Sequence, residues 1–533
     1  MNSHLETVAF PLGRRARQWF AEQQFDAARE ALESLLRQVP ANPFVQMDLA
    51  AVLLRCGRLG DAATLMLDVA QSDDPQPSLD IQLARGLSAA GEVVAARSCL
   101  DRLERAADLP AMLLAEQAHL RWGMRDIPAA RRMIDRAVAA GAGAPRELHL
   151  QAMLRQFAGE TDEAGRLLDA CLDRWPAFGD AALARANLRT QTAQTHHLDF
   201  LRLQLQRLPA DAGAPAQLAN RAAFEAAVFK ELDDLGRYDE AWPAMQRCNA
   251  LMHRVRPYDA QGETAVVDAL IRVAGSLGRS AAPGAQQEEG PQPIFIVGMP
   301  RSGTTLLDRM LSSHSQVASA GEIMDFPQQL RRVAGVVPHG AAGTLAAIER
   351  GAELDLADLG ARYLAQTRWR APGCRYFIDK LPTNIRMVAH IRRALPHARI
   401  VHVVRDPLEV CFSNLSMMFG NRAAYSYDQR AMVHYYGQYR RLARHWQTTM
   451  PDSMIEVAYA DLVREPGVAL RKVLDHCGLA MEEACLHPER NAAPVATPSA
   501  AQVREPIHGR GSGRWRPYAS HLDVLRGAVL DMA

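Results

Sequence analysis

The chain contains few lysines and no cysteine pair of the kind that binds metals. Of its 61 lysine and arginine residues, only Lys230, Lys380 and Lys472 are lysines. The eight cysteines are scattered without a Cys-x-x-Cys motif, which fits neither a zinc cage nor a dense disulfide framework. We interpret them as reduced, mostly buried residues. A lysine within a motif is therefore unusual in this chain, whose basic residues are almost all arginines.

Long hydrophobic runs are also lacking. No stretch approaches the ~18 unbroken apolar residues of a membrane span, and the first twenty residues lack the apolar core of a signal peptide. The formal net charge is only +1, with 48% hydrophobic and 23% charged residues. This balance favours neither disorder nor general nucleic-acid binding. We expect a cytoplasmic globular protein of several domains, with no membrane span and no nucleic-acid partner.

A repeated pattern runs through the first half of the chain. The glycines of four copies lie 34, 32 and 36 residues apart, at Gly57, Gly91, Gly123 and Gly159. An earlier copy has Gln24 at this position and a later copy has Gly236. Each copy continues with an alanine about five residues on and then with apolar residues at helical spacing. The pattern predicts an all-α solenoid of stacked helix-turn-helix units, with a nonrepetitive helical bundle as the alternative.

These copies resemble the tetratricopeptide repeat, and "GRYDEA" is the best local match. We expect the repeats over residues 1–278. Residues 279–293, "RSAAPGAQQEEGPQP", are rich in Ala, Gly, Pro and Gln without an apolar period, which predicts a linker. A second domain would then span residues 294–533. Binding of the acceptor, binding of a protein partner, self-association and a spacer role all stay open for the repeats, because a fold does not name its ligand.

The second half begins with a strand, a loop and a helix in "PIFIVGMPRSGTTLLDRML". Gly298 and Gly303 bracket four residues, as in a Walker loop, and such glycines let backbone N–H groups turn toward an anion. The Walker lysine is replaced by Thr304, followed by Thr305, and Arg301 stands inside the loop. The sequence predicts an α/β, P-loop-like domain whose ligand has no γ-phosphate. A P-loop kinase or NTPase, and a repeat scaffold that binds nucleotide without turnover, are the alternatives.

The loop "PRSGTT" resembles the 5′-phosphosulfate-binding loop of sulfotransferases. Arg405 and Ser413 in "VVRDPLEVCFSNL" have the eight-residue spacing of the contacts that this family makes with the 3′-phosphate. The domain is most similar to the tyrosylprotein sulfotransferase-like branch and to bacterial proteins that join tetratricopeptide repeats to such a domain, over about residues 293–518. The resemblance implies a central parallel sheet and the donor 3′-phosphoadenosine 5′-phosphosulfate (PAPS), converted to 3′-phosphoadenosine 5′-phosphate (PAP), without a metal.

The resemblance also implies roles for individual residues. Glu322 in "SAGEIMDF" corresponds to the general base, and Lys380 in "FIDKLPTN" and Arg301 to the catalytic cations. His402 and His314 are the alternatives if Glu322 is not the base. The implied donor-binding residues are Arg301, Ser302, Gly303, Thr304, Thr305, Arg405, Ser413, Tyr459, Ser499 and Arg514.

The sequence does not identify the acceptor. The tyrosylprotein branch has arginines soon after the catalytic glutamate, which recognise acidic peptides. Here no basic residue follows Glu322 before Arg331 and Arg332. The hydroxyl of a protein tyrosine, of a sugar and of a lipid therefore all stay open as acceptors.

Overall fold

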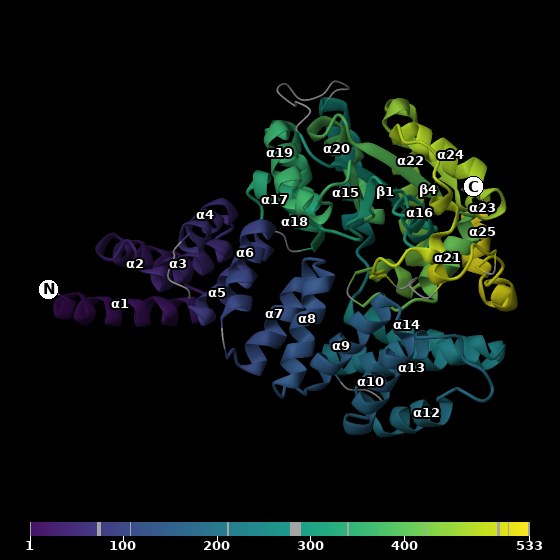
Figure 1. The fold of residues 1–533 in the computed structure, drawn as a ribbon, viewed down its shortest axis with the longest axis horizontal. Helices are drawn as coiled ribbons and strands as arrows, with labels where there is room; N and C mark the ends of the chain where they lie inside the picture. The colour runs from purple at the N-terminus through teal and green to yellow at the C-terminus, as the bar shows by residue number, and fades with distance from the viewer. Residues whose placement is uncertain are drawn as a thin grey trace.

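The computed structural model describes residues 2–71, 76–106, 108–209, 213–277, 289–337, 340–420, 422–497, 502–509 and 511–530. Its N-terminal half is helical, and its C-terminal half contains a parallel β-sheet flanked by helices (Figure 1). Among the described residues, no helix is long and apolar enough to cross a membrane. The fold class expected from the sequence, a helical repeat solenoid followed by an α/β domain, is confirmed.

The helices of the N-terminal half pack largely against their neighbours in the chain, so that pairs such as α1 with α2 and α7 with α8 form successive layers. Apolar faces that no single pair could cover are buried by this stacking. The helices are α1 (Asn2–Ala21), α2 (Phe25–Gln38), α3 (Pro43–Arg55), α4 (Leu59–Ala70), α5 (Pro77–Ala89), α6 (Val93–Arg105), α7 (Ala111–Gly123), α8 (Ile127–Ala139), α9 (Pro145–Ala158), α10 (Thr161–Arg174), α11 (Gly179–Asn187), α12 (Leu198–Arg207), α13 (Pro215–Asp234), α14 (Tyr238–Val255) and α15 (Ala260–Leu277).

The turns within the helix pairs follow a regular period of 34 residues. A residue with positive φ occupies each of five turns at this spacing: Gln23, Gly57, Gly91, Arg125 and Gly159. The sequence alignment placed two of these turns wrongly, at Gln24 and Gly123. Gly123 is instead the last residue of α7. The period is therefore more regular than the glycines alone indicated, and two turns use a residue other than glycine.

Alanines keep the paired helices close together. Each lies five residues beyond a turn, and all are fully buried: Ala28, Ala62, Ala96, Ala130, Ala164 and, after the turn at Gly236, Ala241. A methyl group at this position lets the two helices of a pair approach closely, whereas a larger side chain would separate them. The alanine expected from the sequence is thus a packing residue of the repeat.

The sheet of the C-terminal half has the strand order β2-β3-β1-β4-β5, and each strand pairs in parallel with its neighbours. Its strands are β1 (Gln292–Gly298), β2 (Val317–Ser319), β3 (Tyr376–Asp379), β4 (Arg399–Val404) and β5 (Ile455–Ala458). Strand β1 lies at the centre and is almost completely buried. A buried parallel strand reads as a continuous apolar run, which explains the sequence "PIFIV".

Helices cover the sheet and connect its strands, as parallel strands require. The α-helices are α16 (Thr304–Leu311), α17 (Asp325–Ala334), α18 (Gly340–Arg350), α19 (Leu356–Thr367), α20 (Val388–Ala394), α21 (Pro407–Leu415), α22 (Gln429–Thr449), α23 (Tyr459–Arg464), α24 (Pro466–Cys477) and α25 (Asp523–Leu530). Short 3₁₀ helices join them at 351–353, 368–370, 382–387, 424–427, 451–453, 483–486, 488–490, 502–504 and 516–521.

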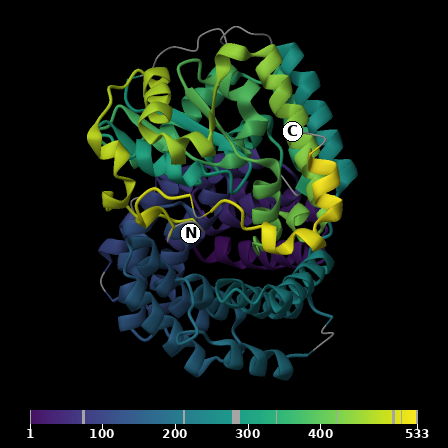
Figure 2. The same ribbon diagram turned by 90° about the vertical axis from the view of Figure 1, so that its right-hand side faces the viewer.

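The two halves are packed against each other along the turn edge of the repeats. The backbone oxygen of Gly91 accepts a hydrogen bond of 2.6 Å from Gln329, and the oxygen of Phe157 accepts one of 2.7 Å from Arg504. One hydrophobic core contains residues from both halves, including Trp242 of α14 and Phe295 of β1. Figure 2 shows the C-terminal segment, in yellow, running between the sheet region and the lower repeat helices. The boundary at residues 279–293 stays a prediction.

Candidate functional site

The carboxyl ends of the five parallel strands bring the predicted site residues together. The loop with Arg301 follows β1, Glu322 lies three residues after β2, Lys380 follows β3 directly, Arg405 follows β4 and Tyr459 follows β5. The strand order places β1 between β3 and β4, so the acid and the lysine lie on one side of the loop and Arg405 and Tyr459 on the other. Parallel α/β sheets bind ligands at this edge.

The loop after β1 requires its two glycines. Gly298 has φ 151° and Gly303 has φ 104°, both in the region that favours glycine. A Cβ on Gly298 would lie 2.5 Å from the backbone oxygen of Val403, and a Cβ on Gly303 would lie 2.3 Å from the ring of Tyr459. The first glycine therefore lets the loop leave the sheet, and the second lets it pass against the aromatic ring.

The hydroxyls of the loop are buried around the start of α16. Ser302 is 1% exposed, and Thr304 and Thr305, the first two residues of α16, are 4% and 7% exposed. The Oγ of Ser302 has no hydrogen-bond partner among the described residues. A buried hydroxyl without a partner is costly, and the amides at a helix N-terminus attract anions, so this cradle suits a phosphate or sulfate oxygen.

Arg301 adopts a left-handed backbone conformation with φ 70°. A left-handed arginine is strained, and such strain is often found at functional sites. Its Nε donates to the Oγ of Ser413 at 3.2 Å. Burial, together with the neighbouring cations Arg514 and Arg405, lowers the pKa of Arg301 to about 10. The guanidinium stays charged at neutral pH, and because other cations surround it, an anionic ligand would be stabilised there.

Arg405 is fixed on the other side of the loop. It donates through Nη1 to the oxygen of Arg301 at 3.2 Å and through Nη2 to the oxygen of Gly511 at 2.6 Å, and it pairs with Glu409 at 3.2 Å. Its guanidinium lies over the ring of Tyr459, 4.5 Å from the centroid, at cation–π distance. The buried Nε has no partner among the described residues and can donate to a ligand.

Glu322 and Lys380 form an ion pair with 2.6 Å between Oε1 and Nζ. Lys380 is fully buried, whereas the side chain of Glu322 is 24% exposed. Burial raises the pKa of Glu322, but Lys380, Arg125 and Arg422 together outweigh burial, so the pKa lies below its ordinary value. Glu322 is therefore an anion at neutral pH, in the form that accepts a proton.

Two of the donor-binding residues implied by the resemblance are not seen among the residues at the loop in the same way as the others. Ser499 lies outside the described residues. Arg514 pairs with Asp233 of α13 at 2.5 Å between Nη2 and Oδ2, so in this structure it is held by the repeats. Arg514 nevertheless lines the same cavity as the loop, and its charge contributes to lowering the pKa of Arg301 after the larger effect of burial.

The two alternative bases have other roles. His402 contacts the hydroxyl of Tyr439 at 2.6 Å within the core, and His314 contacts the oxygen of Ala480 at 3.1 Å. Both are buried, and neither is among the described residues that line the cavity beside Glu322. Glu322 is thus the better placed of the three candidates.

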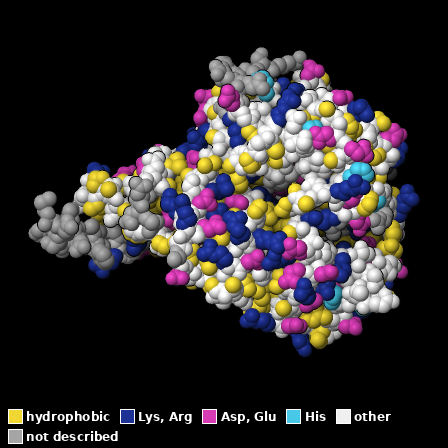
Figure 3. Space-filling model, in the orientation of Figure 1, with side chains coloured by type: hydrophobic (Ala, Val, Ile, Leu, Met, Phe, Trp, Pro, Cys, Tyr) yellow, Lys and Arg dark blue, Asp and Glu magenta, His cyan; other side chains and the backbone are white. Residues whose placement is uncertain are grey.

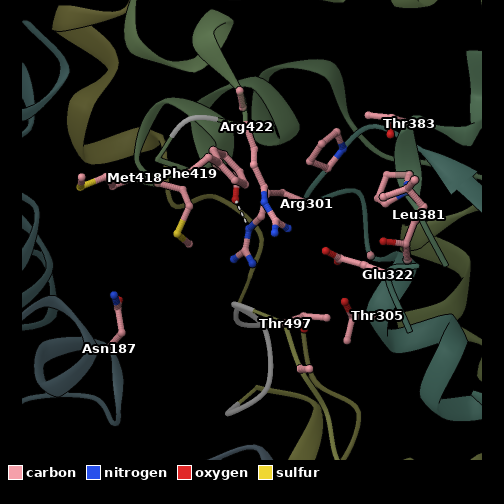
Figure 4. A pocket seen from close by; sticks show the side chains of 18 of the residues that line it. Asn187, Arg301, Thr305, Glu322, Leu381, Thr383, Met418, Phe419, Arg422 and Thr497 are labelled. Carbon is pink, nitrogen blue, oxygen red and sulfur yellow. Dashed lines mark hydrogen bonds between the residues drawn. The ribbon is translucent and has the colours of Figure 1, made fainter. Parts of the chain in front are cut away.

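A cavity of about 1700 Å³ opens at the site. Figure 3 shows this face of the molecule hollowed between its two halves. In Figure 4, Arg301 and Arg422 reach into the cavity, Glu322 points toward them from the side of Leu381, and Asn187 of α11 faces them from the repeats. The lining also includes the apolar side chains of Met153, Phe157, Met418 and Phe419. Among the described residues, no group of three or more His, Cys, Asp or Glu side chains is arranged to hold a metal ion.

Sequence reasoning missed the contribution of the repeats to this cavity. Helices α7 to α15 and their turns supply many lining residues, among them Arg125, His149, Lys230 and Tyr258. Arg125 could have been noticed from the sequence, because a strict 34-residue period puts this arginine where three other copies have glycine. Arg422, which lies 100 residues after Glu322, gave no comparable signal.

Comparison with known proteins identifies both parts of the chain. Residues 293–483 match the sequence model described as the sulfotransferase family, and residues 20–80 match that of the tetratricopeptide repeat. The protein thus joins tetratricopeptide repeats to a sulfotransferase-family domain, as expected from the sequence.

An uncharacterized protein of Aquifex aeolicus is 25% identical over 516 residues, which cover 93% of this chain and 66% of that protein. Protein-tyrosine sulfotransferase 1 of Danio rerio is 25% identical over 239 residues, covering 42% of this chain and 65% of the relative. The chain therefore spans just under two thirds of the length of these relatives. Among solved structures, the sulfotransferase domain of the Synechococcus PCC 7002 olefin synthase is 24% identical, with a TM-score of 0.31, over 47% of this chain and 98% of that domain.

Proposed function

We propose that the protein transfers a sulfuryl group from PAPS to an acceptor hydroxyl. The main observation in support of this proposal is the ion pair of Glu322 and Lys380, beside a loop that suits an anion but has no Walker lysine. The pair supplies a carboxylate to take a proton and a buried cation to stabilise a departing phosphate, and these are the two charges that sulfuryl transfer to a hydroxyl requires. The family match favours this reaction over a nucleotide kinase or NTPase.

The residues present fit the two phosphate groups of such a donor. The partnerless Oγ of Ser302 and the N-terminus of α16 suit the 5′-phosphosulfate. On the other side of the loop, the Nε of Arg405 is unused, and Ser413, which accepts a bond from Arg301, keeps its hydroxyl proton for donation. These two donors suit the dianionic 3′-phosphate.

The chemistry assigned to this chain is positioning and charge stabilisation. Lys380 contacts Oε1 of Glu322, which leaves Oε2 to accept the proton of the acceptor hydroxyl. As the sulfuryl group moves to the acceptor oxygen, negative charge grows on the 5′-phosphate, and Arg301, Lys380 and the loop amides stabilise it. Mutations of such groups change the rate more than the affinity for substrate.

The test is an acceptor screen with PAPS that carries a radiolabelled sulfuryl group. Tyrosine peptides, sugars, lipid alcohols and a cell extract serve as acceptors, and mass spectrometry identifies the labelled product. We expect label in an acceptor together with an equal amount of PAP, in the presence of a magnesium chelator. Glu322→Gln is the matched control for contaminating activity. In a parallel assay with ATP and magnesium, hydrolysis of ATP without sulfuryl transfer in the screen would show instead that the domain is an NTPase.

A further inference from the structure

The turn between α7 and α8 departs from the rule of its own repeat. Gly57, Gly91 and Gly159 occupy this position in three other copies, with φ between 78° and 87°. Arg125 adopts the same left-handed conformation, with φ 63°, although its Cβ makes this conformation unfavourable. The arginine therefore adopts this turn at a local conformational cost, as Gln23 does in the first pair, and the contacts of its side chain decide whether it has a role.

The side chain of Arg125 extends into the sulfotransferase half. Its Nε donates to the backbone oxygen of Glu322 at 3.3 Å, and its guanidinium lines the same cavity. The adjacent oxygen of Met124 accepts a hydrogen bond of 3.0 Å from Arg370. Arg370 also forms a buried ion pair of 3.1 Å with Asp325, three residues after Glu322. This repeat turn is thus hydrogen-bonded directly to Glu322 and is connected to Asp325 through Arg370.

The electrostatic environment of Glu322 includes the same arginine. The charged groups that act on its carboxylate or respond to it are Lys380, Arg125, Arg422, Arg301 and the buried Asp308. Arg125 lowers the pKa of Glu322, after Lys380, and Arg422 adds to this effect. The proximity of Arg422 in turn lowers the pKa of Arg125 after the larger effect of burial. Two arginines from separate halves, Arg125 and Arg422, therefore act on the carboxylate together with Lys380.

We propose that Arg125 is a positioning residue for Glu322, so that the tetratricopeptide repeats complete the catalytic site of the sulfotransferase domain. The hydrogen bond to the backbone of Glu322 fixes the start of the 322–325 segment, and the charge keeps the carboxylate deprotonated. This inference rests on the proposed function, in which Glu322 accepts the proton. It gives the repeats a part in the reaction itself, besides any part in binding partners.

The sharpest variant is Arg125→Gly, because glycine is the residue that this turn accepts elsewhere in the chain. We expect the variant to fold with an unchanged or higher midpoint of thermal unfolding. Hydrogen exchange of a peptide spanning residues 320–324 should become faster in the ligand-free protein. With the acceptor found in the screen, kcat should fall about ten- to hundredfold, the scale of a misplaced catalytic group. The acid limb of the kcat profile should move to higher pH, and Arg125→Lys should restore part of that shift.

Gln23→Gly is the matched control, because Gln23 has φ 62° in the equivalent turn of the first pair and is exposed. It should relieve the same strain without changing kcat, the pH profile or exchange at residues 320–324. Wild-type kcat and pH profile in Arg125→Gly would overturn the proposal. Hydrogen exchange tests the positioning separately from the reaction: if the wild type transfers no sulfuryl group, the proposed function fails, whereas unchanged exchange in Arg125→Gly refutes the positioning itself.

Discussion

Arg514 of the C-terminal segment and Asp233 of α13 form an ion pair across the two halves of the protein, with 2.5 Å between Nη2 and Oδ2. The other oxygen of Asp233 accepts a hydrogen bond of 2.7 Å from Tyr518. The family resemblance assigns Arg514 to the donor, but here the repeats hold it. If Arg514 binds the donor as the resemblance implies, Asp233 and the donor compete for the same guanidinium.

The variant Asp233→Asn tests this competition. Without the negative charge, Arg514 is released toward the loop, and we expect PAP to bind a few times more tightly, which corresponds to less than about 1 kcal/mol. Asp234→Asn is the matched control, because Asp234 pairs with Lys230 on the same helix. Isothermal titration calorimetry measures both variants. Equal PAP affinity in Asp233→Asn and wild type would mean that Arg514 stays on the repeats when the donor binds.

The variant Glu322→Gln tests the general base. Glutamine keeps the size of the side chain but cannot take a proton, so turnover should fall by about 10² or more. Donor affinity should change less than about threefold, or under about 0.7 kcal/mol. The measurements are kcat at saturating donor and acceptor, and PAP affinity by calorimetry. Near-normal turnover would exclude Glu322 as the base.

The variant Lys380→Met tests the link between the ion pair and the pH dependence. Lys380 lowers the pKa of Glu322, so the wild-type rate should fall only at acidic pH, below the ordinary range of a glutamate. Methionine removes the cation, the pKa of Glu322 rises, and the acid limb of kcat should move to higher pH while kcat itself decreases. The pH–rate profile measures this shift. An unmoved limb would assign the titration to another group.

The variant Arg405→Ala tests the side of the loop that faces the proposed 3′-phosphate. A charge-assisted contact to a phosphate is worth about 1.5 to 3 kcal/mol, so PAP affinity should fall at least tenfold. Adenosine 5′-phosphosulfate, which lacks the 3′-phosphate, serves as the control ligand and should bind nearly as before. Calorimetry with both ligands decides, since equal losses would remove the 3′-phosphate assignment.

A chain that begins at residue 282 tests the predicted domain boundary. The ring of Tyr518 packs against Tyr238 and Trp242 of α14, with centroids 5.5 and 5.9 Å apart, and against Phe412 at 5.2 Å. Removing the repeats would expose this shared core, so we expect the shortened chain to lose cooperative thermal unfolding. A cooperative transition together with PAP binding would support independent folding of residues 294–533.

The sequence predicted features that local patterns encode. The spacing of the glycines revealed the repeat, and the alanine about five residues after each turn supported it, because close helix packing needs a small side chain there. The turns at Gln23 and Arg125 were misplaced, because glycine was taken as their marker. The backbone conformation defines a turn, and residues other than glycine can adopt it, as Gln23 and Arg125 do.

In the candidate site, too, the sequence indicated the residues of local motifs but not the contacts between distant residues. The resemblance to sulfotransferase motifs pointed to Glu322, Lys380 and Arg405, and they lie near one another because the segments after parallel strands share one edge of the sheet. The contacts of Arg125 with Glu322 and of Asp233 with Arg514 join residues 197 and 281 positions apart. No local pattern encodes such pairs, since they depend on how the solenoid curves against the sheet.

Of the turns that repeat every 34 residues, the one at Arg125 contacts Glu322. The turn at Gly91, before this arginine, also contacts the second half through Gln329, so only pairs farther out, toward the arm of α1 to α3 in Figure 1, could vary in number without removing such contacts. We expect a unit inserted between Arg125 and the first strand to separate Arg125 from Glu322, which it now contacts. We therefore expect the number of repeats to vary at the outer end of the solenoid and to be fixed between Gly91 and the sheet.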